Sequence, residues 1–427
     1  MKRRECRYSR HVAATETLDR YLLPRVTEAL TDTRIVVIQG ARQVGKSTLA
    51  ESIVAERDAL LVTLDDPEVR SFAAFDPTGF VDQYPEGLLV IDEIQRTPDL
   101  VVSIKAAVDR DKRPGRFLVT GSANLLDLTS THESLAGRAE SLALHSFSQG
   151  ELASHPGSFV DAAFSGVRPL RYRSDLSRHE YMERACAGGY PEALSRASSR
   201  RRQDWYATYL TQIINRDAAD VSGLQRLADL PRLLRLIAAR SGSTMVWTAL
   251  ANDAWIPRRT LDPYIRLLET LFLIHVLPAW ASNLTTREVK QPKIFPLDSG
   301  LTASLLGLTP AALGPTNVAA GGLLECFVVG EVRRQLGWSE QRAALYHYRD
   351  SRGLEVDLIL EAPDASVVAI EVKAAATVQR KDVAGLLALR DRLGDRFVGG
   401  YVLHTGERAH SLGDRLTALP IDALWSL

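Results

Sequence analysis

The chain has 427 residues, of which 45% are hydrophobic and 24% are charged, and this composition is typical of a globular protein rather than a disordered one. Single hydrophobic cores stop growing at about 250 to 300 residues, so we expect two to four domains. The 52 basic and 52 acidic side chains balance, which excludes a chain that is basic overall but leaves room for a local basic surface.

The cysteines and the apolar runs of the sequence indicate the cellular compartment of the protein. Cys6, Cys186 and Cys326 are far apart in the sequence and show neither zinc spacing nor a disulfide pattern. The longest apolar stretch, LFLIHVLPAW, is far shorter than a membrane span, and no apolar signal core follows the basic N-terminus. We therefore expect a soluble, unexported protein of the reducing cytoplasm that has no membrane partner.

Residues 34–54 combine a strand, a glycine-rich loop and a helix. The run RIVVIQG is apolar without alternation, which predicts a buried parallel strand, and STLAESIVAE has helical spacing. The loop between them matches G-x-x-x-x-G-K-[ST], in which backbone N–H groups and a helix N-terminus surround phosphate oxygens. We predict a binding loop for ATP, and the alternative is a tight turn with an incidental lysine. The predicted loop consists of Gly40, Ala41, Arg42, Gln43, Val44, Gly45, Lys46, Ser47 and Thr48.

Side chains in and beyond this loop fit the chemistry of a triphosphate. We expect Lys46 to contact the β- and γ-phosphates and the Ser47 hydroxyl to ligate Mg²⁺. A hydrolase also needs a carboxylate on a neighbouring strand to hold the metal, and LLVIDEIQR offers Asp92 after four apolar residues. Glu93 follows directly and would polarise the attacking water. We therefore predict ATP hydrolysis; the alternative is a strand that ends in a solvated acidic turn.

Two further segments, ALLVTLDD and RFLVTGSAN, predict strands, so that four strand and helix units emerge. Ser122 ends the last strand, where it would sense the γ-phosphate or position water; Asn124 is the second candidate, and a plain turn is the alternative. Arg138 follows a glycine and would reach a γ-phosphate across a subunit boundary as an arginine finger. That role requires a homo-oligomer, and the alternative is a surface ion pair.

Six motifs occur in an order that resembles a family of prokaryotic AAA-type ATPases. The resemblance covers nearly the whole chain and implies an α/β protein with three regions. These are a parallel-sheet P-loop ATPase core over residues 1–200, a helical and winged-helix region over 201–300, and a C-terminal domain of unknown function, similar to the restriction-endonuclease fold, over 301–427. The motifs are GARQVGKST, LLVIDEIQR, LVTGSAN, SLAGR, FSQGEL and GGYPEAL.

The middle region has helical spacing in four segments between about residues 203 and 275. The last two segments are joined by the turn IPRR and followed by two strand-like runs, IHVLPAW and KIFPLDSG. This is the order of a winged helix-turn-helix, which suggests DNA as a partner. Arg258, Arg259 and Arg266 would then approach the phosphate backbone. The alternative is a module that packs beside the nucleotide and transmits its state.

Acidic residues interrupt two apolar runs near the C-terminus. LEVDLIL and VVAIEVKAA read as strands, and charged groups so close to a core are costly unless they are paired or metal-bound. Glu371 and Lys373 lie two apart and project to one face, where Asp357 on the adjoining strand can meet them. Asp357 and Glu371 would bind Mg²⁺ or Mn²⁺ beside Lys373, as in a nuclease site. The alternative is an edge strand with solvated charges.

The preceding helix adds another acid. Glu325 lies on the apolar face of GLLECFVVGEVRRQLGW, whereas Glu331 is nearer the edge and is expected to be solvated. The order Glu325, Asp357, Glu371, Lys373 resembles the PD-(D/E)xK nuclease superfamily, although Val356 replaces the proline before the aspartate. The resemblance implies that Glu325 assists the metal.

We therefore predict an ATP-hydrolysing protein whose C-terminal domain binds nucleic acid and cuts it with a metal ion. The alternative from another class is an ATP-dependent switch or scaffold whose C-terminal domain binds nucleic acid or protein without cleaving it. A P-loop domain that senses ATP without steady turnover is a third hypothesis.

Overall fold

The structure is a computed structural model, and it describes residues 18–122, 135–218, 227–283, 285, 287, 290–314 and 316–427. These residues form two compact units, which are residues 19–146 with 270–272, called here the N-terminal unit, and residues 147–269 with 273–427, called here the C-terminal unit. Within the described ranges, no helix has the length and apolar character that crossing a membrane requires.

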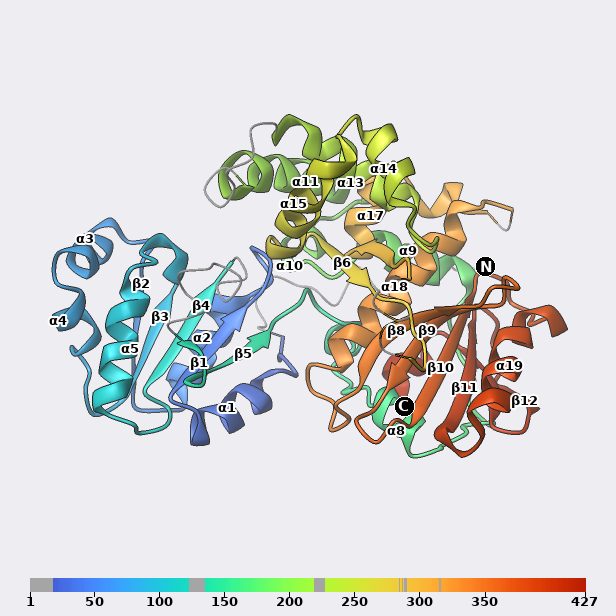
Figure 1. Cartoon of the computed structure of the whole chain (residues 1–427), viewed down its shortest axis with the longest axis horizontal. Helices are drawn as coiled ribbons and strands as arrows, with labels where there is room; N and C mark the ends of the chain where they lie inside the picture. The colour runs from blue at the N-terminus through green and yellow to red at the C-terminus, as the bar shows by residue number, and fades with distance from the viewer. Residues whose placement is uncertain are drawn as a thin grey trace, which may run out of the picture. The chain divides into compact units, whose positions relative to one another are not determined.

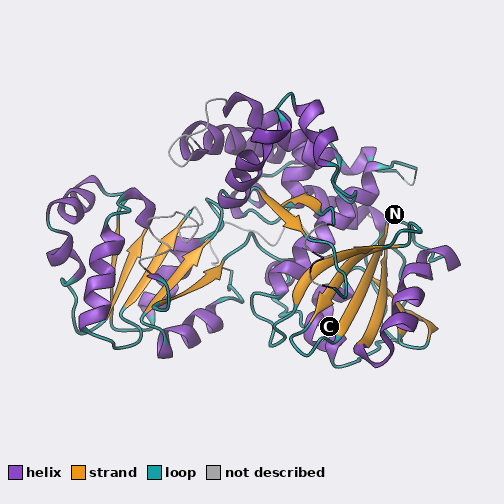
Figure 2. Ribbon diagram, viewed as in Figure 1, coloured by secondary structure: helices purple, strands orange, loops and turns teal. Residues whose placement is uncertain are grey.

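The N-terminal unit is built on a five-stranded sheet in the order β2-β3-β4-β1-β5 (Figures 1 and 2). Every pairing in it is parallel. β4 lies between β1 and β3, so the carboxyl ends of these three strands are neighbours at one edge of the sheet. The strands are β1 Ile35–Gln39, β2 Ala59–Thr63, β3 Leu88–Asp92, β4 Phe117–Gly121 and β5 Ala139–Ala143.

The four strands predicted from their apolar runs are β1, β2, β3 and β4, and the fifth strand, β5, was missed. β5 has the sequence AESLA and forms an edge of the sheet, with none of its residues buried. An edge strand pairs on one side only and needs no continuous apolar run. Its partner β1 is buried over the first four residues.

Helices cover both faces of this sheet. Residues of α3, α4 and α5 share a core cluster with one set of alternate strand residues, among them Val37, Ile91 and Val119. The intervening residues, such as Val36 and Leu118, are also buried, and α1 and α2 contact the strands. The helices are α1 Leu23–Asp32, α2 Lys46–Ala55, α3 Pro67–Phe75, α4 Pro77–Val81 and α5 Leu100–Arg110.

The C-terminal unit contains a mixed six-stranded sheet in the order β12-β13-β11-β10-β9-β8 (Figure 1). β10 pairs with β11 in parallel and with β9 in antiparallel fashion. The two strands predicted around the acids are β9 and β10, which adjoin as expected. The strands are β8 Ala344–Arg349, β9 Glu355–Glu361, β10 Val367–Lys373, β11 Phe397–His404, β12 His410–Gly413 and β13 Leu416–Pro420.

Two hydrophobic clusters cover the two faces of this sheet. Leu358 and Ile370 pack with residues of α8 Phe159–Phe164, α9 Arg178–Ala187 and α18 Ala319–Gln335. Ile359 and Ala369 pack with residues of α19 Ala384–Leu393. The helices that follow residue 147 are therefore part of the C-terminal core, and the predicted domain boundary near residue 200 falls inside the C-terminal unit. The remaining short helices of this unit are α7 Gln149–Leu152, α10 Pro191–Leu194, α17 Ser299–Leu305 and α20 Ala423–Ser426.

The described residues between 199 and 296 of the C-terminal unit form a layer of helices and a two-stranded sheet. The described helices overlap all four segments predicted to be helical, and an antiparallel pair, β6 with β7, follows them. Three helices followed by two antiparallel strands is the element order expected of a winged helix. The elements are α11 Ser199–Gln212 with a π-helical continuation Ile213–Asp217, α13 Leu230–Ala239, α14 Trp247–Ala254, α15 Arg258–Thr270, β6 Ile274–Leu277 and β7 Lys293–Pro296.

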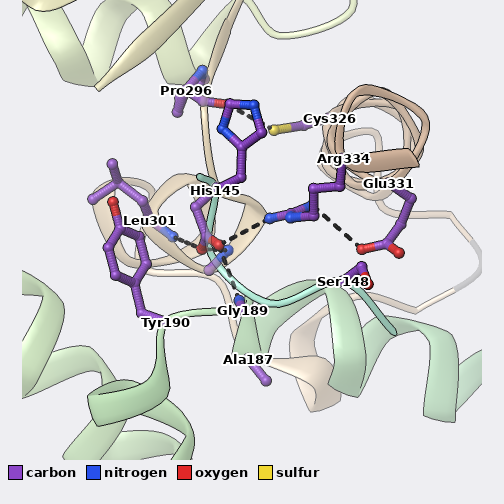
Figure 3. Close-up of polar contacts among 12 residues, drawn as sticks. His145, Ser148, Ala187, Gly189, Tyr190, Pro296, Leu301, Cys326, Glu331 and Arg334 are labelled. Atoms are coloured by element: carbon purple, nitrogen blue, oxygen red, sulfur yellow. Dashed lines mark hydrogen bonds and ion pairs between the residues drawn. The ribbon is translucent and has the colours of Figure 1, made fainter. Parts of the chain in front are cut away.

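A buried ionic network joins distant segments of the C-terminal unit, and Figure 3 shows Arg334 at its centre. Arg334 donates from Nη2 to Asp298 Oδ2 (3.4 Å) and from Nη1 to Glu331 Oε1 (3.3 Å). Asp298 Oδ2 also accepts from the Gly189 N–H (2.9 Å), and its Oδ1 accepts from the Tyr206 hydroxyl (2.9 Å). Because a buried charge is costly without partners, these contacts fix how the segments pack.

The network explains two of the sequence motifs and corrects one expectation. Glu331 was predicted to be solvated, but it is only 1% exposed and accepts from the Gln149 N–H (2.9 Å) in the FSQGEL motif. Burial raises the pKa of Glu331 to about 7. The prediction was wrong because a helical pattern does not reveal that a second chain segment covers this face. Gly188 and Gly189 of the GGYPEAL motif lie against Asp298.

Candidate nucleotide site and C-terminal ionic centre

The predicted ATP loop connects β1 to α2. Gly45 has φ +96° and precedes Lys46, the first residue of α2, and this left-handed conformation is one that glycine adopts without strain. A side chain at Gly40 would lie 2.1 Å from the Leu144 carbonyl oxygen, so only glycine allows this approach of the loop to the chain after β5. Glycine is therefore required at position 45 for its left-handed backbone and at position 40 for the close approach to Leu144.

Basic side chains hold the loop in shape. Lys46 is 4% exposed, and its Nζ donates to the carbonyl oxygens of Gly40 (3.0 Å) and Ala41 (2.9 Å). Arg20 donates to the carbonyl oxygens of Val44 (2.6 Å) and His145 (2.6 Å). Lys46 thus lies inside the curve of the loop, and its contact with the β- and γ-phosphates stays a prediction. Arg20 was not predicted, because it lies outside the motif, 24 residues before Val44 in the sequence.

Asp92 meets the loop at the carboxyl end of β3. Ser47 Oγ donates to both Asp92 oxygens, at 3.1 and 2.9 Å, and Thr120 Oγ1 donates to Oδ1 at 2.5 Å. Asp92 is 7% exposed, and hydroxyl groups rather than a basic side chain satisfy it in these contacts. The structure therefore brings together Ser47 and Asp92, the two residues predicted to hold Mg²⁺. A hydroxyl and a carboxylate are ligands that fit that ion.

Glu93 has a backbone conformation that few residues other than glycine adopt. Its φ and ψ are +60° and +46°, which costs about 1 to 3 kcal/mol and commonly marks a functional site. The Glu93 N–H donates to Thr120 Oγ1 (3.1 Å), and the Gln95 amide donates to the Glu93 carboxylate. The same amide donates to Ser122 Oγ at 2.8 Å. Gln95 therefore links the two residues that were predicted to act on the attacking water.

Ser122 lies at the tip of β4, the strand between β1 and β3. Its N–H donates to Gln95 Oε1 (3.3 Å), which makes the Ser122 and Gln95 contact reciprocal. The strand order places Ser122 at the edge of the sheet where β1 and β3 also end, and its predicted role at the γ-phosphate or the attacking water stays a prediction. The second candidate, Asn124, lies outside the described residues.

Arg138 forms an ion pair with Asp109. Its Nε and Nη2 donate to the two carboxylate oxygens at 2.6 and 3.0 Å, and this bidentate contact lowers the pKa of Asp109. The contact matches the surface ion pair that was the alternative to an arginine finger. A finger acts across a subunit boundary, so that role of Arg138 stays a prediction.

The second group of predicted residues lies in the C-terminal unit around a lysine that was not predicted. Lys293, at the start of β7, is 0% exposed. Its Nζ lies 2.7 Å from Glu325 Oε1, 2.7 Å from Glu355 Oε1 and 3.0 Å from Asp357 Oδ1. Glu325 belongs to α18 and the other two acids belong to β9. We call Lys293, Glu325, Glu355, Asp357, Glu371 and Lys373 the C-terminal ionic centre.

Glu371 and Lys373 complete this centre at the end of β10. Lys373 Nζ donates to Glu371 Oε1 at 2.6 Å, and the Val372 N–H donates to Asp357 Oδ2 at 2.9 Å. Burial first, and the nearby Asp357 carboxylate second, raise the pKa of Glu325 and of Glu371 to about 8. Burial lowers the pKa of Lys293, but the carboxylates of Asp357, Glu325 and Glu355 outweigh it, so the net shift is upward.

The positive charge of the centre comes from two lysines. Lys293 and Lys373 are ammonium groups at neutral pH, since each has its pKa raised by the acids around it. His347 is buried nearby, and burial and Lys293 lower its pKa to about 4, so it adds no charge. The carboxyl groups of Glu325, Glu355, Asp357 and Glu371 therefore meet two lysine cations within the centre.

Sequence comparisons support the assignment of the N-terminal unit. Residues 32–153 match the family model described as an AAA domain. The chain thus contains a P-loop domain of the AAA ATPase type, as the resemblance of the six motifs implied. Two further models match residues 178–312 and 320–424, and both are described as domains of unknown function. Those descriptions assign no activity to the C-terminal unit.

Relatives extend over both units. An uncharacterized protein of Mycobacterium bovis and one of Mycobacterium tuberculosis are each 27% identical to the chain over 405 residues, which cover 94% of this chain and 83% of each relative. Among solved structures, a Walker-type ATPase of Pyrococcus abyssi has 16% identity and a TM-score of 0.43, covering 69% of this chain and 98% of that one. DnaA of Aquifex aeolicus, bound to AMPPCP, has 14% identity and a TM-score of 0.27, covering 58% and 86%.

The acids of the C-terminal ionic centre do not fit a metal ion as they are arranged. Among the described residues, no group of three or more His, Cys, Asp or Glu side chains is placed to hold a metal. Glu325 and Asp357, two of the acids expected around the metal, instead share the Lys293 ammonium. The prediction of a metal bound by Asp357 and Glu371 therefore finds no support here, because a lysine from β7 supplies the positive charge.

Further residues of the two sites were not predicted. Thr120 and Gln95 lie in motifs that were recognised, LVTGSAN and LLVIDEIQR, but nothing in their type indicates which neighbour they bond. Lys293 had one signal, since a lysine that begins the buried run KIF is unusual for an apolar strand. Glu355 lies two residues before Asp357, and this spacing on a strand places two acids on one side.

Proposed function

We propose that the N-terminal unit binds ATP with Mg²⁺ and hydrolyses it. The observation that carries the proposal is the hydrogen bond from Ser47 to Asp92, because it joins the phosphate-binding loop to the carboxylate at the end of β3. A tight turn with an incidental lysine would not require a buried carboxylate to meet the hydroxyl that follows that lysine. The parallel strand order supports the same conclusion, since ligands bind at the carboxyl ends of such strands.

Each side chain then has a defined role. The N–H groups at the start of α2 and the Lys46 ammonium bind the phosphate oxygens. Ser47 and Asp92 hold the Mg²⁺, and this ion when bound neutralises charge on the β- and γ-phosphates. Thr120 fixes the orientation of Asp92 through its hydroxyl.

Glu93 is the general base of this proposal. Its carboxylate would accept a proton from the water that attacks the γ-phosphate. Gln95 orients that carboxylate and also the Ser122 hydroxyl. Ser122 would then contact the γ-phosphate or the water. The strained backbone of Glu93 supports this role, because such strain persists where the surroundings hold it in place.

Two variants test hydrolysis and binding separately. Glu93→Gln removes the base but keeps the shape, so it should bind ATP as the wild type does and lose at least about a hundredfold in kcat. Lys46→Ala should lose ATP binding itself. Calorimetry with a non-hydrolysable analogue and a phosphate-release assay measure the two effects. Hydrolysis that is unchanged in Glu93→Gln would contradict the role of this residue.

For the C-terminal unit we propose nucleic-acid binding that responds to the nucleotide state. The order of α13, α14, α15, β6 and β7, read as a winged helix, supports it, as do the exposed side chains of Arg259 and Arg266 on α15. Arg258 pairs with Asp262 at 2.7 Å and is the weaker candidate. The double variant Arg259→Ala/Arg266→Ala should weaken DNA binding and reduce its salt dependence. Equal binding of DNA by wild type and variant would favour a protein partner instead.

Cleavage is the second candidate for this unit. The Glu371 and Lys373 pair at the end of β10 favours it, whereas the ammonium of Lys293 among the acids favours binding without cleavage. Nicking of duplex or single-stranded DNA in Mn²⁺ that Asp357→Ala and Lys373→Ala abolish, and Lys46→Ala does not, would establish cleavage. We also propose that the protein forms a homo-oligomer if Arg138 serves a neighbouring subunit, and sedimentation in ATP tests that.

A further inference from the structure

The backbone before and after Lys293 is fixed by contacts with neighbouring segments. It pairs with Leu277 across the β6 and β7 ladder, and the preceding residue, Pro292, accepts the Met245 N–H at 2.7 Å. The following residues of β7, Ile294 and Phe295, are 0% and 1% exposed. Because the strand is fixed and fully buried, the lysine cannot turn out to solvent without a rearrangement of this part of the fold.

The Lys293 ammonium is satisfied where it lies. An ammonium has three N–H donors, and three carboxylate oxygens surround it, from Glu325, Glu355 and Asp357, at 2.7 to 3.0 Å. The second oxygen of Asp357 accepts a backbone N–H from β10, and Lys373 binds Glu371. The geometry therefore matches a closed set of ion pairs and hydrogen bonds.

A metal ion would need the same oxygens at shorter distances. Mg²⁺ binds oxygen at about 2.0 to 2.1 Å and Ca²⁺ at about 2.3 to 2.6 Å. Glu325 and Asp357 both approach Lys293 Nζ, so a cation between these two acids would have to displace the ammonium or lie against it. Two cations in contact repel strongly in a buried setting. Metal and Lys293 are thus alternatives for one position.

We propose that Lys293 is the resident cation of the C-terminal ionic centre, that it takes the position a divalent metal would need, and that this domain therefore binds its partner without metal. The lysine gives the acids their counter-charge and fixes the ends of β9 and β10 relative to α18. The proposal does not depend on the ATP site. It predicts that removing the Lys293 ammonium creates a divalent-cation site.

The test titrates Mn²⁺ into the full chain without nucleotide, with free Mn²⁺ followed by electron paramagnetic resonance. Wild type should have no Mn²⁺-binding site that is lost in the Asp357→Asn variant. Lys293→Met keeps the length of the side chain and removes its charge, so this variant should bind one Mn²⁺ at least tenfold more tightly than wild type. Adding Asp357→Asn to it should abolish the new site. Lys290→Met is the matched control, because Lys290 donates to the Arg349 carbonyl (3.2 Å) rather than to an acid, and it should behave as wild type.

Thermal unfolding gives a second measurement on the same proteins. Lys293→Met should have a lowered Tm in chelator that Mn²⁺ raises, since the metal restores the missing positive charge. The wild-type Tm should not respond to Mn²⁺. A Lys293→Met protein that folds and gains no Mn²⁺ site would overturn the proposal. A Mn²⁺ site that is present in wild type and lost in Asp357→Asn would also overturn the proposal. The comparison of wild type with Asp357→Asn tests the proposal even if Lys293→Met fails to fold.

Discussion

Gly188→Ala is expected to destabilise the C-terminal unit severely, because Gly188 lies against the buried Asp298 network. Its φ and ψ are +69° and −160°, a region almost restricted to glycine, and occupying it with alanine costs about 1 to 3 kcal/mol. The new Cβ would lie 2.1 Å from Asp298 Oδ1 and 2.3 Å from the Tyr206 hydroxyl. Separating those two atoms removes buried hydrogen bonds worth about 1 to 3 kcal/mol. Together these costs predict a loss of about 4 kcal/mol.

The measurement is urea unfolding followed by tryptophan fluorescence. All six tryptophans, the first of which is Trp205, lie in the C-terminal unit, so the signal reports on this unit alone. Gly307→Ala is the matched control, since Gly307 also has a positive φ of +63° but nothing lies within 4 Å of its added Cβ. It should lose only about 1 to 2 kcal/mol. If Gly188→Ala were no less stable than Gly307→Ala, the clash with the network would be refuted.

Three further predictions concern single contacts. Thr120→Val should lower kcat for ATP about tenfold, because the hydroxyl that orients Asp92 is lost; an unchanged phosphate-release rate would exclude that role. Arg138→Ala should lower kcat by about 10³ if Arg138 is an arginine finger, whereas Asp109→Ala should not; equal small effects would leave only the surface ion pair. For Glu331, a folded-state pKa of about 7 against 4.5 unfolded means that the folded state holds the proton more tightly, so stability should fall as pH rises from about 4.5 to 7. Urea unfolding of Glu331→Gln should show a weaker fall in this window, and an identical slope would contradict the shift.

The nucleotide loop was predictable because its function depends on local sequence. Nine consecutive residues from Gly40 to Thr48 contain the glycines, the lysine and the hydroxyl, and the flanking apolar run and helical spacing fix the direction of the loop. Asp92 was predictable for a similar reason, since a buried strand that ends in an acid is rare without a ligand. The parts of the site within one motif could therefore be read in advance.

Contacts between distant segments were not predictable. Glu331 was expected in solvent because the helix pattern gives its angle around α18 but not the segment at Gln149 that covers it. β5 was missed because an edge strand carries no continuous apolar run. Lys293 lies 32 residues before Glu325 and 64 before Asp357, and no local pattern encodes such pairings. In each case the missing information was a contact with a segment far away in the sequence.

Asp92 and Asp357 illustrate why the partner decides the chemistry. Both are aspartates with 7% exposure, and both lie on strands of buried sheets. Hydroxyls satisfy Asp92, and a hydroxyl contributes no charge, so this carboxylate keeps its full attraction for a divalent cation. An ammonium satisfies Asp357, and it neutralises the charge that a metal would require. The different partners of these equally buried aspartates therefore predict opposite responses to Mn²⁺, with ATP-dependent binding at Asp92 and no binding at Asp357 while Lys293 is present.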